Sequence, residues 1–151
     1  MLSMLYRYQR CSTHNQSHVL SVQIRLVIRI GRQLLSHSNV NVGIISPLNH
    51  CRIGFQPLAC YMPGNVGLIA KSGTLSYETV GALTRAGLGQ STCIGMGGDI
   101  LAGTNMVEAL QFFEHDEDTD GIILVGEVGG RAELDAADWI TEYRKRCTSP
   151  K

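Results

Sequence analysis

Residues 64–87, GNVGLIAKSGTLSYETVGALTRAG, decide the fold of this chain. Val66–Ala70 is a short apolar run preceded by a Pro-Gly-Asn turn, which is typical of a buried strand. A small polar turn, residues 71–74, follows it. From Leu75 to Ala86 the apolar residues fall at helical spacing, with Glu78 in the first turn and Gly87 after the last. This stretch therefore predicts an amphipathic helix.

The turn between this strand and this helix is the first candidate site. A strand that turns through Ser72, Gly73 and Thr74 into a helix directs several backbone N–H groups at one point. The positive end of the helix dipole lies at the same point, so the turn predicts a site for phosphate or another anion. The alternative is that Gly73 only permits a tight turn and that Ser72 or Thr74 only caps the helix.

The second half of the chain repeats the strand–turn–helix pattern twice. The apolar run Ser91–Gly95 precedes a helical stretch, Thr104–His115. The run Gly121–Val125 precedes a helix from Ala132 to Arg146, which has acids early and bases late. Three such units with short connections predict an α/β fold with a parallel sheet and flanking helices.

Loops that contain glycine follow all three predicted strands. The carboxyl ends of parallel strands meet at one edge of the sheet, where ligands bind. Glycine lets the backbone come close to a ligand, so three such loops at one edge strengthen the case for a site. The further loop residues that we expect at this edge are Lys71, Gly97, Gly98, Asp99, Gly129 and Gly130.

Two acids in these loops are candidates for chemistry. Glu127 follows an apolar strand, and a partly buried carboxylate there would orient an imidazole or accept its proton. The alternative for Glu127 is an exposed loop acid. Asp99 would either bind a ligand or cap a turn before Thr104.

Charge is distributed unevenly along the 151 residues. Met1–Tyr77 contains seven Lys or Arg and no acid, whereas the remainder contains thirteen acids and six bases. Such asymmetry indicates a tail, a targeting segment or a fragment. The arginines show no aromatic interleaving, and no run of 18 apolar residues exists, so we expect neither a nucleic acid nor a membrane as partner. The five cysteines form no CxxC pair, and no metal site is predicted.

Three regions follow from this composition. Residues 1–39 have the arginines, serines and lack of acids of a mitochondrial transit peptide. The alternatives are a divergent, disordered or artefactual N-terminus, or a strand within residues 17–30. Residues 40–63 are rich in turns and predict a linker, with short strands at 42–45 and 52–55 as the alternative. Residues 64–151 form the predicted domain.

Three segments in the predicted domain resemble the alpha subunit of succinate–CoA ligase (succinyl-CoA synthetase): residues 66–78, 87–99 and 126–130. The resemblance extends from about Gly43 to Arg146. Citrate-cleaving ATP enzymes share Gly97-Gly98-Asp99 and the Gly-Glu-x-Gly-Gly loop, but residues 74–78 and 89–92 are more similar to the succinate enzyme.

The resemblance implies a partial flavodoxin-like domain of a tricarboxylic acid cycle ligase. That ligase joins a carboxylic acid to CoA at the expense of ATP or GTP, through a phosphohistidine. It implies a beta subunit that binds nucleotide and Mg, in a heterodimer or heterotetramer, and a mitochondrial matrix location, otherwise a cytoplasmic one. By the same resemblance, the turn Ser72-Gly73-Thr74 holds the phosphate and Glu127 hydrogen-bonds the carrier histidine.

The sequence departs from this family in three places. No glycine-rich CoA motif precedes Val40, and the Gly-His-Ala-Gly-Ala sequence that carries the histidine is absent. Lys71 replaces the family's usual Arg. The lysine keeps the positive charge but lacks the forked N–H donors of a guanidinium group. His115 has no matching context. We therefore expect the chain to be inactive alone, with an exposed edge strand after the third unit. The alternative is a non-catalytic module that binds a partner subunit or a CoA-related ligand.

Overall fold

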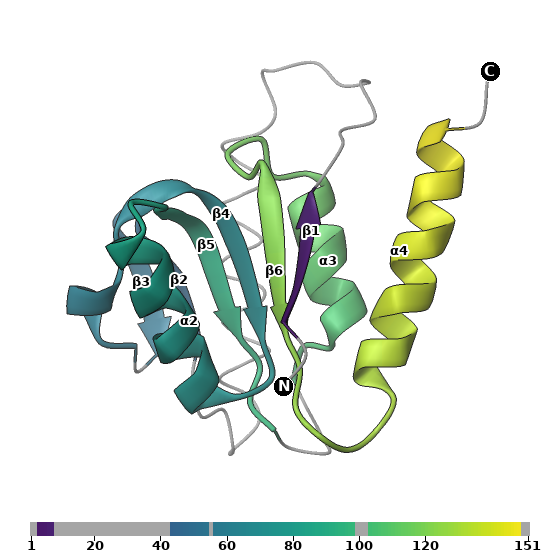
Figure 1. Cartoon of the computed structure of the whole chain (residues 1–151), viewed down its shortest axis with the longest axis horizontal. Helices are drawn as coiled ribbons and strands as arrows, with labels where there is room; N and C mark the ends of the chain where they lie inside the picture. Colours follow the sequence, from purple (N-terminus) through teal and green to yellow (C-terminus); the bar gives the residue numbers. More distant parts are fainter. Residues whose placement is uncertain (1–2, 8–42, 55, 99–102, 149–151) are drawn as a thin grey trace.

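A six-stranded sheet forms the centre of the computed structural model, which describes residues 3–7, 43–54, 56–98 and 103–148. The order across the sheet is β1-β6-β4-β5-β2-β3 (Figure 1). The strands are β1 Ser3–Arg7, β2 Gly43–Ser46, β3 Cys51–Gly54, β4 Pro63–Ala70, β5 Gln90–Gly95 and β6 Gly121–Val125.

The three predicted strand–helix units are confirmed. The helices that follow β4, β5 and β6 are α2 Gly73–Arg85, α3 Met106–Glu114 and α4 Ala132–Thr148, and a short 3-10 helix, η2, spans Leu58–Cys60. Strand β4 pairs in parallel with β5 on one side and with β6 on the other. The first unit therefore lies between the second and the third, as in the flavodoxin-like strand order.

Two apolar layers cover the two faces of this sheet. Leu68 and Ala70 of β4 pack with Val80 of α2, whereas Ile69 packs on the opposite face with residues of α3 and α4. Side chains alternate between faces along a strand, which explains why residues 66–70 of β4 are apolar without interruption. A Cβ atom at Gly67 would lie 2.6 Å from the ring of Phe113, so glycine lets α3 approach the sheet closely.

The region predicted as a linker contributes two strands to the sheet. Strand β2 pairs antiparallel with β5, and β3 pairs antiparallel with β2. The structure thus favours the alternative of short strands at these positions, because burial of Ile44 and Ile45 joins β2 to the core. The boundaries of the three regions stay predictions.

The outer edge of β6 is occupied, and the expectation of an exposed edge strand there is wrong. Strand β1 pairs antiparallel with β6 over its whole length, from Ser3↔Val125 to Arg7↔Gly121. Backbone pairing with β1 satisfies the N–H and C=O groups that β6 would otherwise present. Residues 17–30, for which a strand was one alternative, lie outside the described residues. Of the proposed targeting segment, residues 1–39, the structure describes only Ser3–Arg7, which forms β1.

The ends of α2 differ from the prediction at one terminus. The helix begins at Gly73, so Glu78 lies in its second turn, and the first turn contains no acid. At the other end Gly87 has φ +77°, and its N–H bonds the Thr84 carbonyl while the N–H of Leu88 bonds the Leu83 carbonyl. This is a Schellman motif, so the predicted glycine stop is confirmed.

A chain of polar groups crosses the opposite, amino edge of the sheet. Thr119 Oγ1 donates to Asp116 Oδ2 at 2.7 Å and lies 2.5 Å from Ser91 Oγ, while Ser46 Oγ donates to the Ser91 carbonyl at 2.8 Å. All four side chains are buried. They join β2, β5 and the loop before β6, and their hydrogen bonds satisfy polar atoms that burial would otherwise destabilise.

Candidate functional site

The carboxyl ends of the three parallel strands are level with one another. Ala70 pairs with Gly95 of β5 on one side and with Val125 of β6 on the other. The loops that follow, residues 71–72, 96–105 and 126–131, therefore leave the sheet from adjacent positions, as the strand pattern predicts. Asp99 lies outside the described residues.

The start of α2 is open to a ligand. Ser72 occupies the N-cap position with φ −102° and ψ 128°, but its side chain makes no capping hydrogen bond. Within the described part of the chain, no acceptor meets the N–H groups of Gly73, Thr74 or Leu75. The predicted capping role of Ser72 is therefore absent, and the positive end of the helix has no compensating acid in its first turn.

The other two helices satisfy their N-termini internally. Asn105 and Glu108 form a capping box at the start of α3, with side chain to backbone distances of 2.9 and 3.0 Å. Helix α4 has Glu133 and Asp135 in its first turn. Among these three helices, only α2 begins with neither a capping bond nor an acid in its first turn.

Glu127 lies on the loop after β6, the strand that pairs with β4 directly before this open end. A Cβ atom added to Gly98 would lie 2.7 Å from Glu127 Oε2, so the carboxylate rests against the bare backbone of the loop after β5. Glu127 is exposed, and the expectation of a partly buried carboxylate is wrong. Gly97 has φ +83°, a backbone conformation that glycine adopts readily.

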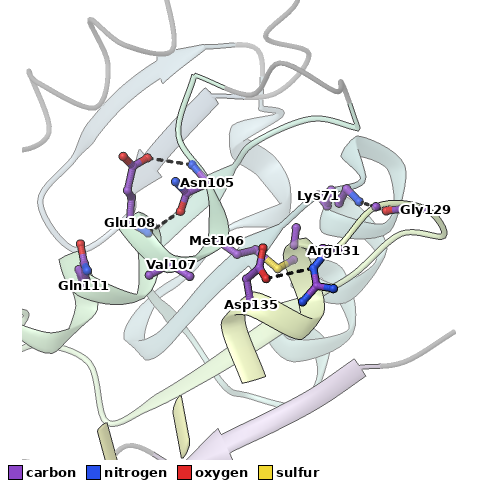
Figure 2. A pocket seen from close by; sticks show the side chains of 11 residues that line it. Lys71, Asn105, Met106, Val107, Glu108, Gln111, Gly129, Arg131 and Asp135 are labelled. Carbon is purple, nitrogen blue, oxygen red and sulfur yellow. Dashed lines mark hydrogen bonds and ion pairs between the residues drawn. The ribbon is translucent and has the colours of Figure 1, made fainter. Parts of the chain in front are cut away.

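Lys71 points to the loop after β6 (Figure 2). Its Nζ donates to the Gly129 carbonyl at 2.6 Å and lies 3.6 Å from Glu133 Oε1. The Lys71 side chain is only 13% exposed. Gly129 and Gly130, both with positive φ, place the carbonyl within reach of this lysine. Lys71 therefore fixes a loop, whereas the sequence predicted only a cation at the ligand edge.

Glu133 is the residue that sequence reasoning missed. Its Oε1 accepts a hydrogen bond from the Glu127 N–H at 2.9 Å. Partial burial raises the pKa of Glu133, but the hydrogen bonds from the backbone of Glu127 and Glu133 and the nearby Lys71 ammonium outweigh that effect. The pKa is therefore lowered from its ordinary value of 4.5. In the sequence this residue appeared only as an acid that favours the start of a helix.

A cleft of about 880 Å³ lies on the side of Lys71 away from α2. Figure 2 shows it between the first turns of α3 and α4. The residues that line it are Lys71, Asn105, Met106, Val107, Glu108, Gln111, Gly129, Gly130, Arg131, Ala132 and Asp135. Neither the Ser72-Gly73-Thr74 turn nor Glu127 belongs to its lining, so the cleft and the predicted anion site are separate surfaces that share Lys71.

Both described histidines lie at the opposite edge of the sheet. His115 follows the last turn of α3, and its Nδ1 lies 3.0 Å from the Gln111 carbonyl. His50 follows β2 in the turn that leads to β3. Within the described ranges no group of three or more His, Cys, Asp or Glu side chains is placed to hold a metal. In the same ranges, no helix has the length and apolar character required to cross a bilayer.

This geometry defines a simple chemistry. Free amides at the start of α2 can donate hydrogen bonds to an anion, and the Glu127 carboxylate can accept one from a donor such as an imidazole N–H. No side chain at this edge is itself paired as a nucleophile and base in the part of the chain that the structure describes.

The chain belongs to the CoA-ligase family, whose model matches residues 69–150. Within this family its relatives are alpha subunits of ADP-forming succinate–CoA ligases. It is 50% identical to alpha subunit 2 from Archaeoglobus fulgidus over 103 residues, and this aligned region covers 68% of this chain and 36% of that protein. It is 46% identical over 102 residues to the mitochondrial alpha subunit 2 of Trichomonas vaginalis, covering 68% of this chain and 33% of that protein.

Solved structures agree with this assignment. An ATP citrate lyase from Methanosaeta concilii, in complex with (3S)-citryl-CoA, superposes with a TM-score of 0.62 at 25% identity, over 83% of this chain and 22% of that one. An acetyl-coenzyme A synthetase from Ca. Korarchaeum cryptofilum shares the fold, with a TM-score of 0.55 at 21% identity, over 89% of this chain and 28% of that one. The chain spans about a third of the length of the curated relatives it matches.

Proposed function

We propose that this chain is the phosphate-handling part of a succinate–CoA ligase alpha subunit. In the whole enzyme, a carboxylic acid and CoA would form a thioester while ATP or GTP yields ADP or GDP and phosphate. The phosphoryl group would pass through a histidine. The observation that carries the proposal is the open start of α2, beside Glu127, in a chain of the CoA-ligase family.

The described residues fit a phosphoryl group at this edge. The N–H groups of Gly73 and Thr74 would donate to its oxygens, and each hydrogen bond to a charged group contributes about 1.5–3 kcal/mol. Ser72 and Gly73 are half-buried and Thr74 is exposed, so the amides are reachable from solvent. Glu127 would accept a hydrogen bond from the carrier imidazole and so hold its ring toward the phosphate.

The remaining components belong to the whole enzyme. We infer a beta subunit as partner, in a heterodimer or heterotetramer, which would bind nucleotide and Mg. CoA would bind to a part of the enzyme with the glycine-rich motif that this sequence does not contain before Val40. Names of the relatives support these assignments, since each is an alpha subunit of a CoA ligase.

A phosphate titration of the ¹⁵N-labelled chain tests the anion site. Inorganic phosphate should shift the amide resonances of Gly73 and Thr74 selectively. Gly73→Pro removes one donor at the first helical position, where proline is tolerated, and the extended backbone of Ser72 suits a residue before proline. We expect about tenfold weaker phosphate binding in this variant. Gly81→Ala in the same helix should leave the affinity unchanged, and equal affinities in all three proteins would contradict the proposal.

Co-purification with a beta subunit of a succinate–CoA ligase tests the partner. The mixture should contain a stable complex without forming phosphohistidine or thioester, because the Gly-His-Ala-Gly-Ala sequence is absent from this chain. Turnover by the mixture would disprove the inactivity of the chain. A complex without any phosphate site would favour the alternative of a non-catalytic binding module.

We propose a mitochondrial matrix location, with the cytoplasm as the alternative. The arginine-rich, acid-free residues 1–39 and the mitochondrial relative from Trichomonas vaginalis support the matrix. Imaging of the full chain with a C-terminal tag, before and after deletion of residues 2–39, distinguishes the two. Because this deletion also removes β1, the amount of each protein is compared on an immunoblot. Unchanged cytoplasmic signal in both would favour the alternative.

A further inference from the structure

The loop Gly126–Gly130 has little in its own sequence to fix its shape. Gly129 and Gly130 have φ +112° and +79°, and Val128 at the tip is fully exposed. Glycines lose much conformational freedom on ordering, so such a loop needs contacts from outside to keep one conformation. Two charged side chains, from different elements, provide those contacts.

Glu133 holds the first half of the loop from the first turn of α4. Its Oε1 accepts the hydrogen bond from the Glu127 N–H at 2.9 Å. A Cβ atom at Gly126 would lie 2.9 Å from Glu133 Cγ, so the side chain also packs directly on the bare backbone of Gly126. The peptide that carries Glu127 is thereby fixed at two adjacent residues.

Lys71 holds the second half from the end of β4. Its Nζ donates to the Gly129 carbonyl at 2.6 Å, and its own N–H donates to the Val125 carbonyl at 2.9 Å. The same Nζ lies 3.6 Å from Glu133 Oε1. Contacts therefore connect the end of β4, the loop and α4. They include Glu127, whose carboxylate rests against Gly98.

We propose that Glu133, paired with Lys71, is a positioning residue that fixes the Glu127 carboxylate beside the start of α2. This inference rests on the proposed function, in which the Glu127 carboxylate would hold the carrier imidazole. Glu133 would then orient that carboxylate. The competing explanation is that Glu133 only balances the helix dipole of α4, a role that Asp135 in the same turn would share.

Amide hydrogen exchange of the full ¹⁵N-labelled chain separates these explanations. Glu133→Ala should accelerate exchange at Glu127 about tenfold and shift the resonances of Gly98 and Gly129, because one hydrogen bond and its anchor are lost. Asp135→Ala is the matched control. It removes an acid from the same turn, but its partner is Arg131 at 3.7 Å, so exchange at Glu127 should stay within about twofold.

A conservative variant identifies the contact responsible. Glu133→Gln keeps an oxygen that accepts from the Glu127 N–H but loses the charge that faces Lys71. It should therefore restore slow exchange at Glu127 while the Gly129 resonance remains shifted. Unchanged exchange of core amides such as Val80 and Phe113 in every variant shows that the fold is intact. The proposal is wrong if Glu133→Ala leaves Glu127 unaltered, or if Asp135→Ala has the same effect.

The same samples keep this inference apart from the proposed function. Phosphate titration of wild type tests the donor amides of α2 separately from the exchange data. If wild type fails to bind phosphate, the proposed anion site fails, while the exchange data still decide whether Glu133 positions Glu127.

Discussion

The ammonium group of Lys71 lies 3.6 Å from the carboxylate of Glu133, joining the end of β4 to the first turn of α4. The same lysine donates to the Gly129 carbonyl, so one cation connects two strand-end loops and a helix. These residues are far apart in the sequence, which predicted Lys71 as a cation at the ligand edge and Glu133 only as an acid early in a helix. Their contact joins β4, the loop after β6 and α4 at the candidate edge of the sheet.

The Lys71–Glu133 contact gives stability a defined pH dependence. The pKa of Glu133 is lowered in the folded chain from 4.5, so ionisation of Glu133 stabilises the fold above that pH. This contribution is lost as the pH falls below 4.5 through the folded pKa. Urea unfolding should show wild type more stable than Glu133→Gln at pH 7, by less than about 1 kcal/mol because the group is partly exposed.

The unfolding free energies of wild type and Glu133→Gln should converge as the pH falls below 4.5 through the folded pKa of Glu133. Asp138→Asn removes an exposed carboxylate from the same helix and serves as the control, since it has no contact with Lys71 in the described structure. A wild-type advantage that persists unchanged at pH 3 would contradict the role assigned to the Glu133 charge.

Removal of the N-cap side chain should destabilise the protein at α3 but have little effect at α2. Asn105→Ala removes a capping box and should cost about 1 kcal/mol, whereas Ser72→Ala removes no capping bond and should change stability by less than about 0.3 kcal/mol. Thermal and urea unfolding of both variants measure the difference. Equal losses would mean that Ser72 caps α2 after all.

Two glycines of the α2 segment should also differ in sign. Gly87→Ala places a side chain at φ +77° with no atom within 4 Å, so only the left-handed backbone opposes it, at about 1 kcal/mol. Gly81→Ala lies inside the helix, where only the flexible end of Arg85 is near, at 3.3 Å. We expect Gly81→Ala to stabilise by about 0.5–1 kcal/mol. Denaturation midpoints test this, and a loss of stability in both variants would contradict it.

The buried hydroxyl of Thr119 should contribute far more than an exposed one. Thr119→Val removes the buried hydroxyl that donates to Asp116 Oδ2 and contacts Ser91 Oγ, which should cost about 2–3 kcal/mol. Thr141→Val changes an exposed threonine that bonds the Ala137 carbonyl of its own helix and should cost less than about 0.5 kcal/mol. Urea unfolding of the two variants provides the comparison, and similar values would show that the buried chain of polar groups is dispensable.

Local pattern predicted the repeated units well. Strand β6 has the predicted bounds, because an apolar run between an acidic loop and a glycine turn admits few alternatives. Helix α2 begins two residues earlier than predicted, since Gly73 and Thr74 adopt helical geometry that their composition does not demand. Because α2 begins at Gly73, Glu78 lies outside its first turn, and the first turn of α2 contains no acid.

Local sequence patterns did not predict the contacts between distant segments. Strand β2 gains its place from pairing with β5, and β3 gains its place from pairing with β2, but no local period shows which strand will be a neighbour. Glu133 has the same sequence context as any acid early in a helix, and only the fold brings Lys71 and Glu127 to it. The candidate loops were predictable as members of one edge, whereas the bonds between them were not.

Pairing of β1 with β6 has a consequence for synthesis. Ser3–Arg7 leaves the ribosome before the other five strands but has no strand to join until Gly121–Val125 has emerged, more than a hundred residues later. Closing so long a loop is slow compared with forming the β4–α2–β5 contacts. Of the six described strands, the first to be made is thus the last to be added to the sheet, and until then the side of β6 remains open to other chains.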